Sequence, residues 1–216
     1  MLSYVASIPK DGEKFSGDSF NFGKNKNGIY VIALSDGMGS GPDAGLESSV
    51  AIDIIDEFIE CGYDEEIAIK AINSIMNMKF SEDEKFTTLD MSMVDLYSGE
   101  LSVIKAGAVA TFIKRYEDVQ VISDNSLPFG AVEEIEYKKK KKKLKHGDIF
   151  ITISDGILDV DKNNIGDYSW LRTYLEKATT NPEQLSRDIL DKAKALSNGK
   201  VMDDMTVVVS KLYSLY

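Results

Sequence analysis

The sequence contains a single cysteine and a single histidine among its 216 residues, and it has no long apolar run. One cysteine, Cys61, excludes an internal disulfide and fits a reducing compartment. No window approaches the roughly 18 consecutive apolar residues of a membrane-spanning helix. The first residues also lack the charged start and long apolar stretch of a signal peptide. These absences predict a cytoplasmic domain that makes no membrane contact of its own.

Basic residues are also scarce, because 25 Lys and Arg stand against 36 Asp and Glu, which gives a net charge of −11. Nucleic-acid phosphates are bound by clustered Lys and Arg, so this balance argues against nucleic acid as the main partner. The acidic excess is either solvated surface or, in part, a cation site. The strand-like pattern begins almost at Met1. We therefore interpret residues 1–216 as one domain, the C-terminal part of a longer protein that has room for an upstream membrane anchor.

Alternating apolar and polar residues predict the strands of a half-buried antiparallel sheet. The strand-like runs are GIYVIALS, TTLDMSMVDLYS, ELSVIKAG, VATFIKRY, VQVIS, GDIFITIS and the closing MTVVVSKLY. Turn-like joints at 97–101 and 115–120 suggest hairpins between them. The lysine run 138–143 is interpreted as a solvent-facing edge strand, because lysines discourage edge-to-edge pairing.

Apolar residues at helical spacing predict helices at about 43–60 and 64–78. The buried stripe of the first would consist of Leu46, Val50, Ile54, Ile55 and Phe58. Asp64 is expected to cap the second helix. A further helix is expected at about 168–177, and Asn181 followed by proline is a strong start for the last one. Helix pairs interleaved with antiparallel strands, without regular β-α-β alternation, indicate an α+β fold.

Aspartates stand where several of these strands begin or end. YVIALSDGM and IFITISDGI both consist of an apolar strand followed by Ser, Asp, Gly and an apolar residue. If the two strands are neighbours, Asp36 and Asp155 lie at the same sheet edge. The pair Asp203-Asp204 precedes the last strand, and Asp18 lies in SGDSF. Such carboxylates would repel one another unless cations were present, and Mg²⁺ and Mn²⁺ take oxygen ligands. One Asp-Gly alone is usually a turn, but the joint pattern predicts a metal site.

These motifs resemble those of metal-dependent protein serine/threonine phosphatases, specifically the catalytic domain of stage II sporulation protein E. The likeness covers about residues 4–211. It rests, in order, on SGDSF, SDGMGSG followed by ES, TTLDMSMVDL, LPFG, GDIFITISDGI and DDMTVVV. The resemblance implies an α-β-β-α sandwich, in which two stacked antiparallel β-sheets are flanked by helices.

The resemblance also implies a set of catalytic residues. Asp36 would bridge two divalent ions, Mn²⁺ or Mg²⁺, with the carbonyl of Gly37 on one of them. Asp155 and Asp203 would ligate the other ion, the family pattern pointing to the first aspartate of the Asp-Asp pair. Asp18 would serve the site directly or through ordered water. All four aspartates are therefore predicted catalytic residues.

The implied chemistry is hydrolysis of phosphoserine or phosphothreonine by a metal-activated water. Two ions about 4 Å apart lower the pKa of a shared water, and the resulting hydroxide would attack the phosphorus in line. Many relatives carry histidine after the Asp-Gly as a candidate general acid, whereas this sequence has Met38. Protonation of the leaving group must then come from elsewhere. His146, the only histidine, is interpreted as an exposed turn residue.

By the same resemblance, the substrate would be a phosphorylated anti-sigma-factor antagonist whose dephosphorylation releases a sporulation sigma factor. The helices at about 43–60 and 64–78 would form a regulatory switch coupled to a homodimer or to a preceding domain. The alternative is that they are two ordinary packing helices.

Two other functions stay open at this point. The chain could be a catalytically weak regulatory module that needs a partner or an upstream domain to complete its metal site. It could also be a two-metal nuclease, which the negative charge disfavours. Activity on a phosphopeptide against activity on a nucleic acid separates the two enzymes.

Overall fold

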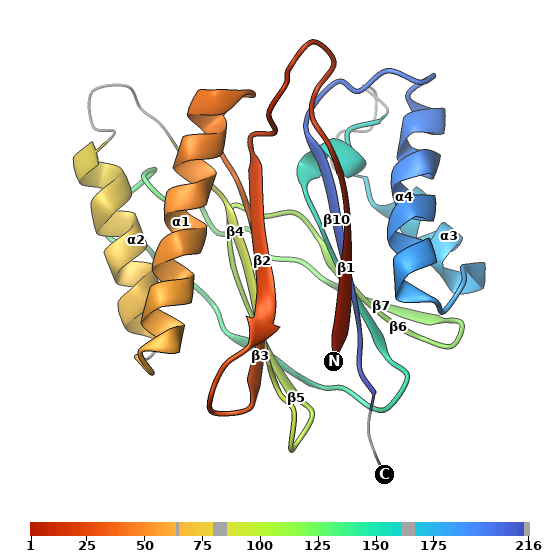
Figure 1. Ribbon diagram of the computed structural model, residues 1–216, viewed down its shortest axis with the longest axis horizontal. Helices are drawn as coiled ribbons and strands as arrows, with labels where there is room; N and C mark the ends of the chain where they lie inside the picture. The colour runs from red at the N-terminus through yellow and green to blue at the C-terminus, as the bar shows by residue number, and fades with distance from the viewer. Residues whose placement is uncertain (64, 80–85, 161–166, 214–216) are drawn as a thin grey trace. The chain divides into compact units, whose positions relative to one another are not determined.

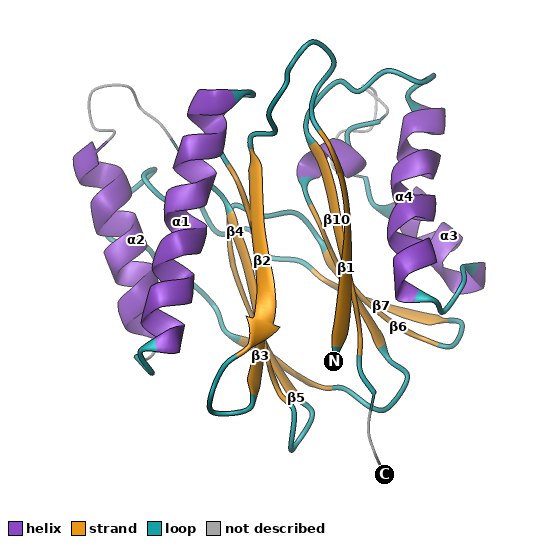
Figure 2. Ribbon diagram, viewed as in Figure 1, coloured by secondary structure: helices purple, strands orange, loops and turns teal. Residues whose placement is uncertain are grey.

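A computed structural model describes residues 1–63, 65–79, 86–160 and 167–213 (Figure 1). The chain divides into two compact units. The terminal unit comprises residues 1–14, 109–123 and 144–216, and the central unit comprises residues 15–108 and 124–143. Within these described ranges, each unit contains one five-stranded antiparallel sheet and a pair of α-helices (Figure 2).

The sheet of the central unit is antiparallel throughout. Its strands, in spatial order, are β2 (Asp18–Lys24), β3 (Ile29–Asp36), β4 (Leu89–Asp95), β5 (Glu100–Ala106) and β8 (Lys140–Lys143). The lysine strand β8 pairs only with β5 at the end of this order, so the predicted edge strand is confirmed. Two of its lysines form ion pairs, since the Lys141 ammonium lies 2.9 Å from the Glu100 carboxylate and the Lys140 ammonium lies 3.3 Å from the Asp124 carboxylate.

Helices α1 (Pro42–Glu60) and α2 (Glu65–Lys79) complete the central unit. The predicted stripe of α1 is partly wrong, because Leu46 is 51% exposed whereas Ile55 is buried. The buried face consists of Ala44, Glu47, Ser48, Ala51, Ile52, Ile55 and Ile59. Small and polar residues turn inward here, because the helix packs closely against the start of β2. The predicted cap at Asp64 lies outside the described residues.

The sheet of the terminal unit is also antiparallel. Its strands, in spatial order, are β1 (Leu2–Ile8), β10 (Met205–Lys211), β9 (Ile149–Ile153), β6 (Thr111–Arg115) and β7 (Asp118–Ile122). The 3₁₀ turn η1 (Asp155–Ile157) follows β9, and the helices are α3 (Ser169–Lys177) and α4 (Pro182–Leu196). The predicted start of α4 is confirmed, since the side chain of Asn181 accepts a hydrogen bond from the Gln184 N–H at 3.0 Å.

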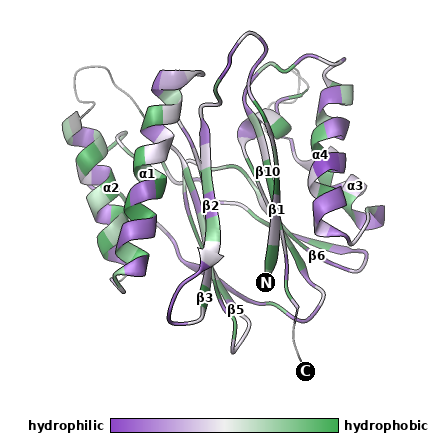
Figure 3. Cartoon of the chain, in the orientation of Figure 1, coloured by the Kyte–Doolittle hydropathy of each residue, from purple (hydrophilic) through white to green (hydrophobic). Residues whose placement is uncertain are grey.

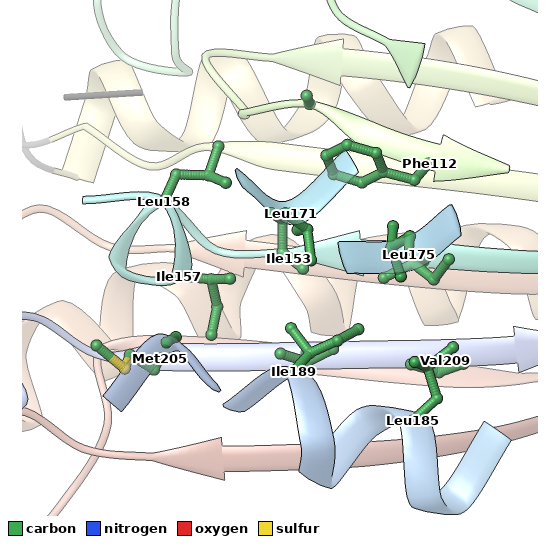
Figure 4. Close-up of a cluster of buried hydrophobic side chains, with 14 of the residues drawn as sticks. Phe112, Ile153, Ile157, Leu158, Leu171, Leu175, Leu185, Ile189, Met205 and Val209 are labelled. Carbon is green, nitrogen blue, oxygen red and sulfur yellow. The ribbon is translucent and has the colours of Figure 1, made fainter. Parts of the chain in front are cut away.

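Apolar side chains from α3 and α4 cover one face of this sheet. Leu171 and Leu175 from α3, with Leu185 and Ile189 from α4, pack over the central strands in one buried cluster (Figure 4). Hydrophobic and hydrophilic residues both occur along α4, as expected for an amphipathic helix (Figure 3). None of the helices in the described ranges is long and apolar enough to cross a membrane.

The predicted fold class, an α+β fold with two antiparallel sheets flanked by helices, is confirmed. The condition for bringing Asp36 and Asp155 to one sheet edge, that the two Ser-Asp-Gly strands are neighbours, is not met. β3 pairs with β2 and β4, whereas β9 pairs with β6 and β10 in the other sheet. Each copy of the motif therefore ends a strand in the sheet of its own unit.

A buried ion pair joins β4 and β5 of the central unit. The Lys105 ammonium lies 2.6 Å from the Asp90 carboxylate, and both side chains are almost fully buried. Burial lowers the pKa of the Lys105 ammonium, and the neighbouring Asp90 carboxylate opposes this shift. Buried pairs of this kind are costly to break, because removing one partner leaves an uncompensated buried charge.

We predict that Lys105→Met lowers the free energy of unfolding by about 3–5 kcal/mol, as measured by urea denaturation. The matched control is Lys141→Met, which removes a lysine from an exposed pair and should cost about 1 kcal/mol or less. Equal losses in the free energy of unfolding for the two variants would show that burial of the Lys105–Asp90 pair does not affect its contribution to stability.

Candidate active site

Two of the predicted aspartates face each other in the central unit. Asp18 opens β2 and Asp36 closes β3, and the antiparallel register pairs them directly. Asp18 is 7% exposed, and Asp36 is partly exposed. The start of one strand and the end of its antiparallel neighbour lie at the same sheet edge. The pairing thus brings together two carboxylates that lie at the two ends of one hairpin.

A close backbone approach follows Asp36. A Cβ added to Gly37 would lie 2.0 Å from the carbonyl oxygen of Ala44, in the first turn of α1. No side chain fits there, although the φ angle of Gly37 is not positive. The next two glycines serve the turn itself, with φ of 92° at Gly39 and 82° at Gly41. The glycine-rich loop is therefore required to bring α1 against the end of β3.

Two threonines hold the backbone of Asp36. The Thr88 N–H and the Thr87 hydroxyl both donate to the Asp36 carbonyl oxygen, each at 2.9 Å. The Asp36 N–H donates in turn to the Thr88 hydroxyl at 3.1 Å. The Thr87 hydroxyl also lies 2.9 Å from that of Ser35. This network fixes the peptide groups on both sides of the Asp36 side chain.

Helix α1 contributes two buried polar side chains to the same end of the sheet. The Ser48 hydroxyl donates to the Gly17 carbonyl at 2.6 Å and to the Ser19 hydroxyl at 2.8 Å. The Glu47 carboxylate accepts a hydrogen bond from the Met38 N–H at 3.2 Å. The sequence analysis quoted these residues within motifs but gave them no role. The sequence feature that could have indicated such a role is a polar Glu-Ser pair, one helical turn after the glycine loop.

The terminal unit brings together the other predicted aspartates. Asp155 opens η1 directly after β9, and Asp203 lies two residues before β10, its antiparallel neighbour. A Cβ on Gly156 would lie 2.2 Å from the Asp204 carbonyl oxygen and 3.3 Å from the Asp203 Cβ. Gly156 thus permits a close approach like that of Gly37. The result is a second group of carboxylates at a strand end.

The two adjacent aspartates have different surroundings. Asp204 is 2% exposed, and its carboxylate accepts the Lys10 N–H at 3.0 Å, so it anchors the chain after β1. Asp203 is partly exposed. Burial raises the pKa of the Asp203 carboxyl, with further upward contributions from Asp204 and Asp159, while the Asp204 N–H and the Lys10 charge oppose the shift. Asp203 is therefore the member of the pair whose negative charge a bound cation would relieve.

The donors gathered at these strand ends are oxygens, which suit hard divalent cations. Over the described ranges, no group of three or more His, Cys, Asp or Glu forms a complete metal-binding cluster. Asp18 and Asp36 belong to the central unit, and Asp155 and Asp203 belong to the terminal unit. Each unit by itself therefore offers a pair of predicted ligands. His146 is exposed in the turn before β9, as predicted.

Comparison with known sequences identifies the family. The profile of stage II sporulation protein E matches residues 26–213, which is most of the chain. The chain belongs to the stage II sporulation protein E family. It is 36% identical over 209 residues to the stage II sporulation protein E of Priestia megaterium, a match that covers 96% of this chain and 36% of that protein. The chain thus spans about a third of the length of this relative.

Solved structures agree with this assignment. The stage II sporulation protein E structure from Bacillus subtilis, which contains the PP2C phosphatase domain and a fragment of the regulatory domain, superimposes with a TM-score of 0.88. That match has 34% identity and covers 97% of this chain and 62% of the other. The RsbX structure in complex with magnesium has a TM-score of 0.73 at 20% identity, covers 97% of this chain and 94% of RsbX, and shows likeness of fold alone.

The resemblance found in the sequence is therefore confirmed. The chain is a PP2C-type phosphatase domain of the stage II sporulation protein E family, and the predicted enzyme class, a protein serine/threonine phosphatase, is confirmed with it. The roles of the individual aspartates stay predictions.

We predict that Gly37→Ala and Gly156→Ala each destabilise the fold by about 1–3 kcal/mol, because the added methyl group overlaps a backbone carbonyl. Thermal unfolding in the presence of a chelator measures this loss without any contribution from metal. Gly23→Ala in β2 is the matched control, since nothing lies within 4 Å of its added Cβ and its φ is not positive. Melting temperatures that fall equally in all three variants would contradict the close-approach interpretation.

Proposed function

We propose that the chain is a metal-dependent protein phosphatase that hydrolyses phosphoserine or phosphothreonine in a small phosphoprotein. The observation that carries this proposal is the placement of the predicted aspartates. Asp18 with Asp36, and Asp155 with Asp203, stand at paired strand ends in a PP2C-type domain. As in the sequence analysis, residues 1–216 are taken as one phosphatase domain of a longer protein.

The residues present fit two divalent ions, Mn²⁺ or Mg²⁺. The proposed ligands are Asp18, Asp36, the carbonyl of Gly37, Asp155 and Asp203, all of them oxygen donors. Asp36 and Asp203 are both partly exposed, so an ion can reach their carboxylates. When bound, the ions would activate a water molecule for attack on the phosphate ester and offset the charge on its oxygens.

The chain's own residues position the proposed ligands. Thr87 and Thr88 hold the Asp36 backbone, and this bonding limits the directions that the Asp36 carboxylate can take. Asp204 supports the neighbouring Asp203 through its bond to the Lys10 N–H. Met38 stands where many relatives have histidine and carries no proton to donate. The proton for the leaving alkoxide therefore comes from a group other than the side chain of residue 38, and no covalent enzyme intermediate is required.

For the substrate we propose a phosphorylated anti-sigma-factor antagonist, on the basis of membership in the family. A homodimer through α1 and α2 is proposed as well. Large apolar side chains exposed on these helices support it, with Leu46 51%, Ile67 49% and Met78 82% exposed. The proposed location of this domain is the cytoplasm, with any membrane anchor in another part of the full-length protein.

A catalytically weak module that depends on a partner or an upstream domain is the second candidate. The contacts of α1 favour it, because the helix touches the proposed ligand loop at Ala44 and Glu47. A displaced α1 would disturb Gly37 directly. High turnover and tight metal binding by the isolated monomer would exclude this candidate.

The deciding experiment is phosphate release from a phosphoserine protein during a Mn²⁺ titration. We predict metal-dependent release that falls by about a hundredfold or more in Asp155→Asn and Asp203→Asn, because even residues that only support metal ligands contribute 10- to 100-fold. Asp191→Asn, an exposed aspartate on α4, is the control and should keep full activity.

Other results would change the conclusion. Cleavage of a nucleic acid instead of the phosphoprotein would favour a two-metal nuclease. Absence of release at every Mn²⁺ concentration by a folded chain would refute the independent enzyme and favour the module that needs a partner.

A further inference from the structure

We propose that Glu47 is a positioning residue, whose carboxylate orients the Gly37–Met38 peptide and so directs the Gly37 carbonyl toward the metal. The inference rests on the proposed metal site, because Gly37 matters in this way only if its carbonyl is a ligand. Glu47 itself is given no contact with metal or substrate.

The geometry of one peptide group carries the argument. The Met38 N–H donates to the Glu47 Oε2 at 3.2 Å and to the Phe86 carbonyl at 3.0 Å. This N–H belongs to the same peptide unit as the Gly37 carbonyl, and the bond is trans. In a trans peptide the N–H and the C=O point in opposite directions. The two acceptors therefore direct the Gly37 carbonyl away from Glu47 and Phe86.

The anionic acceptor adds to this orientation. Hydrogen bonds to a carboxylate are about twice as strong as those between neutral groups. The hydrogen bond to the Glu47 carboxylate also polarises the Gly37–Met38 peptide group, since bonded groups polarise one another. This polarisation increases the negative charge on the Gly37 carbonyl oxygen. Glu47 would thus both hold the Gly37 carbonyl in place and make it a better ligand for a divalent cation.

The burial of Glu47 indicates that its hydrogen bond with the Met38 N–H is an interior contact and not a surface one. The side chain is 1% exposed, on a helix face that also buries Ala44, Ser48, Ala51 and Ile55. Burying a carboxylate costs free energy unless hydrogen bonds compensate it. An apolar residue would satisfy the packing of this face at lower cost. The position of Glu47 one turn into α1 makes the placement of the helix a condition for the direction of the carbonyl.

The test compares Mn²⁺ affinity, measured by titration calorimetry, with melting temperature in the presence of a chelator. Glu47→Met removes the acceptor and keeps a similar volume, and we expect about 10- to 100-fold weaker Mn²⁺ binding. Glu47→Gln keeps an acceptor oxygen but loses the charge, so it should restore part of that affinity. Both variants should stay folded, and the second keeps the inference testable if the first does not.

Two further variants separate positioning from general stability. Ile55→Val loosens the buried face of the same helix, and Glu57→Gln removes an exposed charge from it. Both should bind Mn²⁺ like the parent chain. Parental Mn²⁺ affinity in folded Glu47→Met would overturn the inference, and so would an equal loss of affinity in Ile55→Val. A parent chain that binds no Mn²⁺ would overturn the proposed metal site as well, which is a distinguishable result.

Discussion

The close approach of a backbone carbonyl to a glycine occurs at both aspartate-bearing turns, and the arrangement of the proposed ligands depends on it. The Ala44 carbonyl leaves no space for a side chain at Gly37, and the Asp204 carbonyl leaves none at Gly156. Neither glycine has a positive φ, so ordinary turn geometry does not explain them. What these positions need is the absence of a Cβ. Packing against the following helix or strand thus accounts for Asp-Gly in both motifs.

Both units place aspartates at the ends of paired strands, but different residues hold these aspartates in place. In the central unit, the carboxylates of Asp18 and Asp36 come from paired strands, and threonine hydroxyls hold the backbone of Asp36. In the terminal unit, Asp155 and Asp203 come from the ends of paired strands, and the buried Asp204 acts as the brace. Antiparallel pairing brings the aspartates of each unit together, because the end of one strand always meets the start of its neighbour.

Helix α1 shows how function alters an amphipathic pattern. Leu46 is exposed, while Glu47 and Ser48 are buried against the ends of the strands. A helix selected only for packing would place the leucine inward and the carboxylate outward. The buried pair instead forms hydrogen bonds with Met38, Gly17 and Ser19. These bonds make the position of the helix and the geometry of the glycine loop interdependent, which explains how α1 could regulate the proposed site.

The sequence alone determined the elements and the candidate chemistry. Period-two alternation identified most of the strands but not β2, Asn181 before a proline marked the start of α4, and the aspartates were recognisable at strand ends. These signals are local, because each depends on residues within a few positions of one another. Tertiary structure decided which strands share a sheet, and it placed β3 and β9 in different sheets although their motifs are alike. It also distinguished Asp203 from Asp204 and buried Glu47, since burial and hydrogen bonding depend on partners far away in the chain.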